Sequence, residues 1–217
     1  MQNPLPFLLP ALAAFLFLAL AMPTAAQDGQ PMVPLIMPRL ERKDPHQTMR
    51  EAHVAEQRGD TDTAWALVTS AINSGDLDQR ALADAYIWRG RLTLDGGDPS
   101  QALADFRRAV ELAPQTSPAL AWRALAWLAL GRSETALADA RQATHLTPER
   151  TEAHLALGLA LLALNQPEQA LTSLGQALCL SPKNTPALLA RAKALQALNI
   201  STQPPASPCS EDAQPKQ

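Results

Sequence analysis

The segment HLTPERTEAH, residues 145–154, holds two of the four histidines of the chain together with two glutamates. Imidazole nitrogens and carboxylate oxygens are the groups that bind zinc or transfer protons in catalysis. His145, His154, Glu149 and Glu152 would form such a site only if the fold brought their side chains together. Their role therefore depends on the elements that carry them.

Other residues with possible chemistry are few. His46, Met49 and His53 have the i, i+3, i+7 spacing of one helix face, and Met and His bind copper in some secreted proteins, but solvated or packed side chains are favoured. Cys179 and Cys209 are the only cysteines, and whether they form a disulfide stays open. No glycine-rich phosphate loop is present. The sequence predicts no catalytic residue, no cofactor and no metal site.

Composition and charge narrow the class of protein. The 18 basic and 21 acidic residues give no basic footprint, so nucleic acid is not an expected partner. Alanine and leucine dominate while aromatic residues make up 4 %, which favours closely packed helices over β-sheets. We expect an all-α fold.

The two ends are not expected to belong to this fold. Residues 1–26 are predicted to be a signal peptide cleaved after Ala26, which implies a periplasmic or secreted protein; an uncleaved membrane anchor is the alternative. Residues 27–44 are predicted to be a proline-rich linker, either a mobile spacer or an apolar segment that docks on its own domain or on a partner. Residues 200–217 are predicted to be disordered.

The chain between these ends repeats with a period of 34 residues. Units beginning at Ala83, Ser117 and Thr151 align without gaps over 83–116, 117–150 and 151–184. The prolines 114, 148 and 182 coincide, as do several alanines. A fixed period of this length predicts a helix-turn-helix solenoid, in which stacking of the units completes the core.

The repeated residues have physical roles in such a unit. Small residues at 90, 124 and 158 are predicted to let the two helices approach closely. Gly97, Gly131 and Asn165 accept a left-handed backbone in the turn between them. Each proline ends the second helix two residues after a leucine, and these leucines are predicted to lie in the core: Leu112, Leu146 and Leu180.

This pattern resembles the tetratricopeptide repeat family. The resemblance implies a right-handed superhelix of helix pairs. Residues 45–78, with Ala52, Gly59, Ala64 and Ala71 in register, resemble a diverged first unit followed by about four extra residues. Residues 185–199 resemble a C-terminal capping helix that covers the last apolar face and offers Arg191, Lys193 and Gln196 to water.

Two charged positions vary together between the units. Arg89 and Arg123 become Leu157 in the third unit, while Asp105 and Asp139 become Ser173. We therefore predict that Arg89 pairs with Asp105, and Arg123 with Asp139, across the two helices of a unit. Because partly buried charges are retained chiefly with a partner, the role of these pairs is structural.

In this family the concave groove is lined by fixed positions of each first helix: the second, fifth, sixth, ninth, twelfth and thirteenth. The resemblance assigns to a partner-binding groove Ile87, Trp88, Arg91, Leu94, Trp122, Leu125, Leu128, Leu155, Leu159, Leu162, Leu189 and Lys193. Trp88 and Trp122 share one repeat position and are predicted to form a short aromatic ladder, serving either partner binding or packing. Trp65 and Trp127 are interpreted as core residues.

The Lys and Asn clamp with which some members hold a peptide carboxylate is missing from the three clear units. The resemblance implies a non-enzymatic interaction module that binds an apolar or amphipathic protein segment, as exported relatives do in assembling envelope machines. The alternative is a structural protein that associates with copies of itself; a catalytic role is the least favoured.

In this architecture HLTPERTEAH straddles the junction of two units. Pro148 ends one helix, and His154 takes a packing position in the next. We expect His154 to point into its helix pair and His145 to point outward, with Glu152 in a first helical turn where the helix dipole favours it.

Overall fold

The computed structural model describes residues 44–200, which form nine helices and no strand. They are α1 (Pro45–Gln57), α2 (Thr61–Ser74), α3 (Gln79–Asp95), α4 (Pro99–Leu112), α5 (Ser117–Ala129), α6 (Ser133–Leu146), α7 (Thr151–Ala163), α8 (Pro167–Leu180) and α9 (Thr185–Ala197). None of these helices has the length and apolar character needed to cross a membrane. The predicted signal peptide, the linker, the tail and Cys209 lie outside the described residues.

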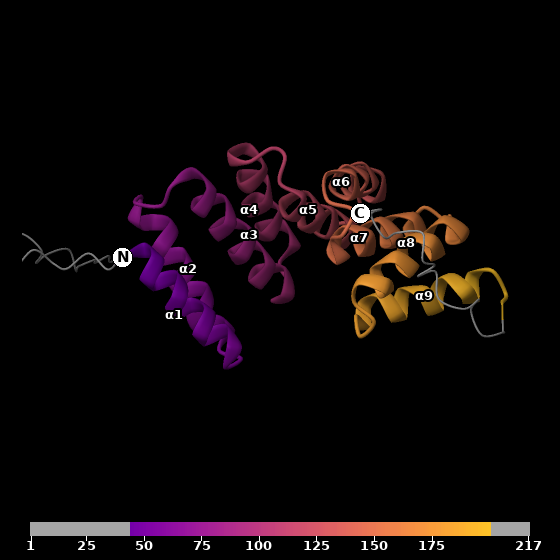
Figure 1. Cartoon of the computed structure of the whole chain (residues 1–217), viewed down its shortest axis with the longest axis horizontal. Coiled ribbons are helices and arrows are strands. Elements are labelled where there is room, and N and C mark those ends of the chain that lie inside the picture. Colours follow the sequence, from indigo (N-terminus) through magenta and orange to yellow (C-terminus); the bar gives the residue numbers. More distant parts are fainter. Residues whose placement is uncertain (1–43, 201–217) are drawn as a thin grey trace, which may run out of the picture. The chain divides into compact units, whose positions relative to one another are not determined.

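The helices form four consecutive pairs followed by α9 (Figure 1). Each helix packs on its neighbours in sequence, and the first helices also contact one another: α3 with α5, α5 with α7, and α7 with α9. Because the contacts join elements close in sequence, each pair completes its core on the next one. The predicted all-α repeat solenoid is confirmed.

The repeated alanines form the interior of this stack. All nine of those shared by the three clear units have no exposed surface: Ala85, Ala102, Ala109, Ala119, Ala136, Ala143, Ala153, Ala170 and Ala177. Ala64 and Ala71 occupy the matching places in the first pair and are also buried. A methyl side chain at these places lets helix backbones approach closely, so the small residues identified from the sequence are the contact positions.

The two helices of a pair approach each other closely at Gly90 and at Gly158. A Cβ atom at Gly90 would lie 2.7 Å from the ring of Phe106, and one at Gly158 would lie 2.5 Å from Leu174. In the pair between them, Ala124 lies in the same buried cluster as Ala140, the counterpart of those two large residues. Glycine thus faces a large side chain and alanine faces a small one, which keeps the volume between the helices filled.

Turns and helix ends follow the predicted chemistry. Gly97, Gly131 and Asn165 have φ values of 88°, 73° and 56°, so each adopts the predicted left-handed conformation. The helices α4, α6 and α8 end at the leucine that comes two residues before each proline. Several first turns are capped by an aspartate, as where Asp98 accepts a hydrogen bond from the Gln101 amide at 2.9 Å.

The two predicted Arg–Asp pairs are present. Arg89 donates two hydrogen bonds to Asp105, at 2.8 and 2.6 Å, and Arg123 donates two to Asp139, both at 2.7 Å. Both aspartates are buried. The guanidinium–carboxylate fork joins the two helices of a pair, and the salt bridge is confirmed in each of the two units where it was expected.

The C-terminal end differs from the prediction in two respects. Leu180 is 42 % exposed and so is not a core residue, whereas Leu146 packs against a buried cluster. The helix α9 buries Ala187, Ala190 and Ala194 and exposes Lys193 and Gln196, but Leu188 and Leu189 are also exposed and Arg191 is half-buried. Within residues 44–200 no further helix pair packs on the last unit, so side chains that are buried inside the stack reach solvent here.

Candidate functional site

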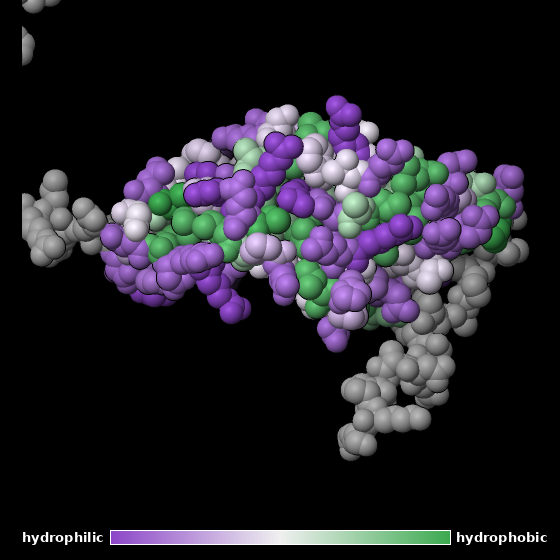
Figure 2. Space-filling view, turned by 90° about the horizontal axis from the view of Figure 1, so that it is seen from above, coloured by the Kyte–Doolittle hydropathy of each residue, from purple (hydrophilic) through white to green (hydrophobic). Residues whose placement is uncertain are grey.

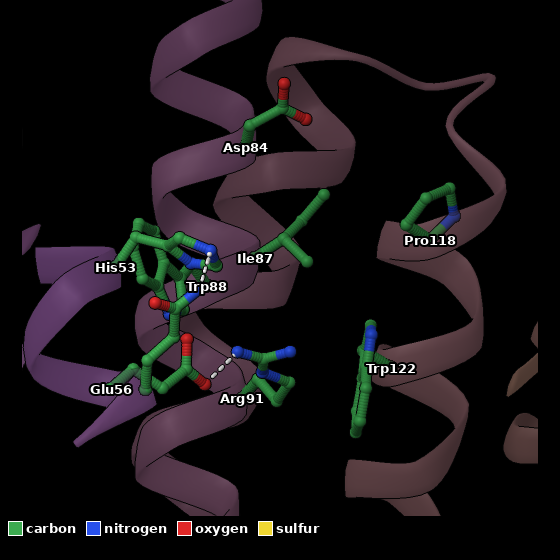
Figure 3. Close-up of a pocket in the computed structure, with 9 residues that line it drawn as sticks. His53, Glu56, Asp84, Ile87, Trp88, Arg91, Pro118 and Trp122 are labelled. Carbon is green, nitrogen blue, oxygen red and sulfur yellow. Dashed lines mark hydrogen bonds and ion pairs between the residues drawn. The ribbon is translucent and has the colours of Figure 1, made fainter. Parts of the chain in front are cut away.

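A pocket of about 410 Å³ lies between the first helices of the first three pairs, α1, α3 and α5 (Figure 3). Its walls are formed by His53, Glu56, Gln57, Asp84, Ile87, Trp88, Arg91, Pro118 and Trp122. The volume is at the lower end of the range typical for ligand pockets, enough for a few side chains of a bound segment.

The lining residues occupy the groove positions of the repeat. His53, Glu56 and Gln57 stand at the ninth, twelfth and thirteenth positions of the first unit when Ala52 is aligned with Gly90. Asp84 and Pro118 share the second position. Residues at these spacings lie on one face of a helix, and stacking brings three such faces around one hollow.

Charged side chains of two units are joined inside the pocket. Arg91 on α3 forms an ion pair and hydrogen bond with Glu56 on α1, and both side chains are about one-third exposed, 34 % and 27 %. Asp95, one helical turn after Arg91, has a raised pKa because burial disfavours its charged form, an effect only partly offset by the charge of Arg91. The guanidinium of Arg91 is therefore already matched by neighbouring carboxylates.

The remaining charged group, Asp84, lies at the opposite end of the pocket from Arg91 (Figure 3). It is exposed, and no base among the described residues forms an ion pair or hydrogen bond with it. Asp84 therefore gives that end of the pocket an unpaired negative charge.

The aromatic residues do not form the predicted ladder. Both Trp88 and Trp122 line the pocket, but the aromatic neighbour of Trp88 is His53, whose ring centroid is 6.0 Å away in an edge arrangement. Among the described residues, no ring contact joins the two tryptophans, and Arg91 lies between them (Figure 3). The prediction is wrong on this point because a long side chain at the ninth position fills the space.

The other two tryptophans lie outside the pocket. The indole of Trp65 donates a hydrogen bond to Thr93 at 3.0 Å, and Trp127 packs against two buried clusters under the guanidinium of Arg107. Both are partly buried packing residues, in agreement with their interpretation as core.

The structure brings together only part of the predicted groove. Ile87, Trp88, Arg91 and Trp122 line the pocket. Six leucines assigned to the groove instead pack against buried clusters along α3, α5 and α7: Leu94, Leu125, Leu128, Leu155, Leu159 and Leu162. Leu189 is 61 % exposed on α9, where Lys193 is exposed as well, and neither lines the pocket.

Five lining residues were missed by the sequence assignment: His53, Glu56, Gln57, Asp84 and Pro118. A signal for each was present. Asp84 and Pro118 stand at the second position of their units, and the first three residues appear at groove positions once the four extra residues are removed from the alignment. The diverged first unit supplies one whole wall of the pocket.

The segment 145–154 is a junction between two pairs. Leu146 ends α6, Thr151 begins α7, and His145 is exposed on the outer side. His154 is only half-buried and makes a 2.7 Å hydrogen bond with the carbonyl of Pro148, so it bridges the junction where we expected it inside its helix pair. No group of three or more metal-binding side chains lies together anywhere in residues 44–200.

The structure also shows where the three residues of the possible copper site, His46, Met49 and His53, lie. Met49 packs against the buried cluster between the first two pairs, whereas His53 faces the pocket and His46 is exposed. These three side chains do not share one open face.

Repeated helix pairs with a hollow on the side of the first helices define a helical-repeat solenoid, a class whose concave surfaces bind other proteins. The tetratricopeptide repeat model matches residues 49–115, 89–150 and 123–188, and the chain belongs to the tetratricopeptide repeat family. The predicted family is confirmed, and with it the general class of a protein-interaction module.

Solved structures with the same fold come from distant proteins. TTC0263, a thermophilic TPR protein of Thermus thermophilus, is 23 % identical with a TM-score of 0.62, covering 72 % of this chain and 84 % of that one. MamA of Desulfovibrio magneticus RS-1 is 17 % identical with a TM-score of 0.57, covering 72 % and 86 %. The first TPR domain of human RPAP3 is 26 % identical with a TM-score of 0.50, covering 54 % and 92 %.

No curated protein sequence matches this chain.

Proposed function

We propose that this protein binds an apolar segment of another protein in the pocket between α1, α3 and α5. The observation that supports the proposal is the convergence of groove positions from three consecutive units on one hollow that contains two tryptophans. Partly exposed tryptophans in a depression are frequent anchors of protein interfaces. Arg91 and Glu56 pair with each other across two helices, which suits binding better than proton transfer.

The rest of the concave side extends this surface. Figure 2 shows one face of the molecule, on which hydrophobic residues, in green, lie between hydrophilic residues, in purple. The half-buried leucines of α5 and α7 continue from the pocket along the stacked first helices. A bound segment would therefore anchor in the pocket and lie along these leucines.

We further propose that the protein is exported and serves envelope assembly as a binding factor or scaffold. The apolar N-terminal sequence with small residues before Gln27 supports export. N-terminal sequencing of the protein purified from its native cells tests this step. A first residue of Gln27 is expected, and recovery of intact Met1 would contradict cleavage.

Affinity capture from envelope extracts tests the binding site. The mature chain is compared with a Trp88→Ala/Trp122→Ala variant and with a matched control, Trp65→Phe/Trp127→Phe, which alters the two tryptophans outside the pocket. We expect the pocket variant to lose partners that the control retains, with helical circular dichroism unchanged in both. Retention of the same partners by the pocket variant would exclude this site.

A second function, self-association, is favoured by one observation. Leu180, Leu188, Leu189 and Ile200 are each more than 40 % exposed near the C-terminal end of the stack. Light scattering at several concentrations separates the two functions: a mass that rises with concentration, and falls back to the monomer in a Leu188→Glu/Leu189→Glu variant, supports self-association. A strict monomer counts against it.

A further inference from the structure

We propose that the pocket recognises a basic side chain, arginine or lysine, that stands next to an aliphatic or proline residue in the partner segment. The inference rests on the proposed function and adds the chemical identity of the segment. The charges of the pocket, its aromatic walls and its aliphatic surface support this inference.

The charge balance of the pocket favours a cation. Arg91 is the only arginine or lysine in its walls, and it is already engaged by Glu56 and attracted by Asp95. Asp84 remains unpaired. The two lining carboxylates, Glu56 and Asp84, against the one guanidinium of Arg91, counting histidine as neutral, leave an excess of one negative charge. An incoming cation therefore gains attraction that an incoming carboxylate would lack.

The walls can also hold the body of such a side chain. Trp88 and Trp122 provide indole rings, and a guanidinium or ammonium group is attracted by the face of an indole ring within about 6 Å of its centre. The chain already uses this contact elsewhere: the guanidinium of Arg107 lies 5.1 Å from the Trp127 ring centre and that of Arg89 lies 5.4 Å from the Tyr86 ring centre. Ile87 and Pro118 supply aliphatic surface between the two ends.

The same pocket residues disfavour the binding of an acidic segment and of a wholly apolar one. A peptide ending in acidic residues needs unpaired bases, and the base that lines the pocket is matched by carboxylates of its own chain. An acidic segment would also meet the unpaired charge of Asp84. A wholly apolar segment would leave that carboxylate without a partner while removing water from it, which costs free energy.

Selection from a random dodecapeptide phage library identifies which side chains the pocket prefers in a bound segment. The mature chain is the bait, and phage that bind the Trp88→Ala/Trp122→Ala variant equally well are removed. We expect the remaining sequences to be enriched in arginine or lysine beside leucine, isoleucine or proline. An apolar consensus without a base overturns this inference but supports the proposed function; failure to obtain any pocket-dependent peptide overturns both.

Charge reversal at Asp84 then tests the assigned residue. Asp84→Lys is compared with Asp62→Lys, which makes the same change on an exposed position of α2 outside the pocket. For the strongest selected peptide we expect Kd to rise by tenfold or more with Asp84→Lys and by less than twofold with Asp62→Lys, the helical spectrum being unchanged. An unchanged Kd with Asp84→Lys would exclude a contact between Asp84 and the basic side chain of the peptide.

Discussion

At the scale of single residues, the two salt bridges show how one unit is held together. Asp105 is 5 % exposed and Asp139 is 7 % exposed, so each is buried with its charge. The hydrogen bond from Arg89 to Asp105 raises the pKa of the guanidinium further, against the effect of its own burial. In the third unit Leu157 takes the place of the arginine and packs in the apolar core beside α8.

Replacement of Asp105 by Ala is expected to lower the free energy of unfolding by about 3 kcal/mol, because it leaves the half-buried guanidinium of Arg89 without its partner. The double variant Arg89→Leu/Asp105→Ser, which copies the third unit, should regain most of this loss. Thermal and urea unfolding measure both. Unchanged melting of Asp105→Ala would contradict a structural role for the pair, and peptide binding in the pocket should be retained.

The raised pKa of Asp95 predicts a pH dependence of stability. An acid whose folded pKa exceeds its unfolded value favours the folded state only while protonated, so stability is lost as the pH rises from about 3.8 through the folded value. The position of Asp95 at the end of α3 adds unfavourable interaction with the helix dipole.

We therefore expect Asp95→Asn to melt at a higher temperature than the natural chain at pH 7 and at the same temperature at pH 3. Differential scanning calorimetry at both pH values measures the difference. A gain of equal size at pH 3 would show that the charge of Asp95 is not its cause.

At the scale of elements, the distance between the two helices of a pair depends on matched volumes. Phe106 and Leu174 each lie over a glycine, and both are fully buried. The matched residue in the middle pair is Ala140, which faces an alanine. A larger side chain on one helix therefore requires a smaller side chain at the facing position of the other helix.

Gly158→Ala tests this volume rule. The Cβ atom of the new alanine would lie 2.5 Å from Leu174. We therefore expect the free energy of unfolding to fall by about 1–2 kcal/mol, even though alanine favours helices more than glycine does. A double-mutant cycle with Leu174→Ala should show a favourable coupling, since the pair then copies Ala124 and Ala140. Stabilisation by Gly158→Ala alone would contradict the close approach.

At the scale of the whole described chain, the two ends of the stack differ in character. The outer side of α1 and α2 forms a second hollow of about 480 Å³ lined mainly by polar residues, with Val54 as its exposed apolar side chain. At the other end, α9 covers the last pair through three buried alanines but carries two exposed leucines. Helical solenoids require covered ends for solubility, and here only the N-terminal end is largely polar.

Ala190→Asp is expected to detach α9 from the stack. Ala190 is 2 % exposed and belongs to the buried cluster with Leu155 and Leu174, so an aspartate there would place an unpaired charge in the core. We expect the free energy of unfolding to fall by about 2 kcal/mol or more and the binding of an apolar dye to increase. Lys193→Asp, on the exposed side of the same helix, is the control; equal stability of the two variants would show that α9 contributes no cap.

The sequence alone determined the features that recur at the fixed period. The helix pairs, the left-handed turns at Gly97, Gly131 and Asn165, the buried alanines and the Arg–Asp pairs could all be predicted. Each is set by contacts within one unit or with the next one. Three aligned units therefore reveal the same physical requirement three times.

Only the tertiary structure decided which groove positions form a pocket and which are covered. Glu56 meets Arg91 across 35 positions of sequence, and His53 takes the place beside Trp88 that we expected Trp122 to take. Leu180 and Leu189 are exposed although the residues at matching positions elsewhere are more buried. The repeat position fixes the direction of a side chain, but the neighbours supplied by the adjoining units decide whether it is buried, paired or free to bind.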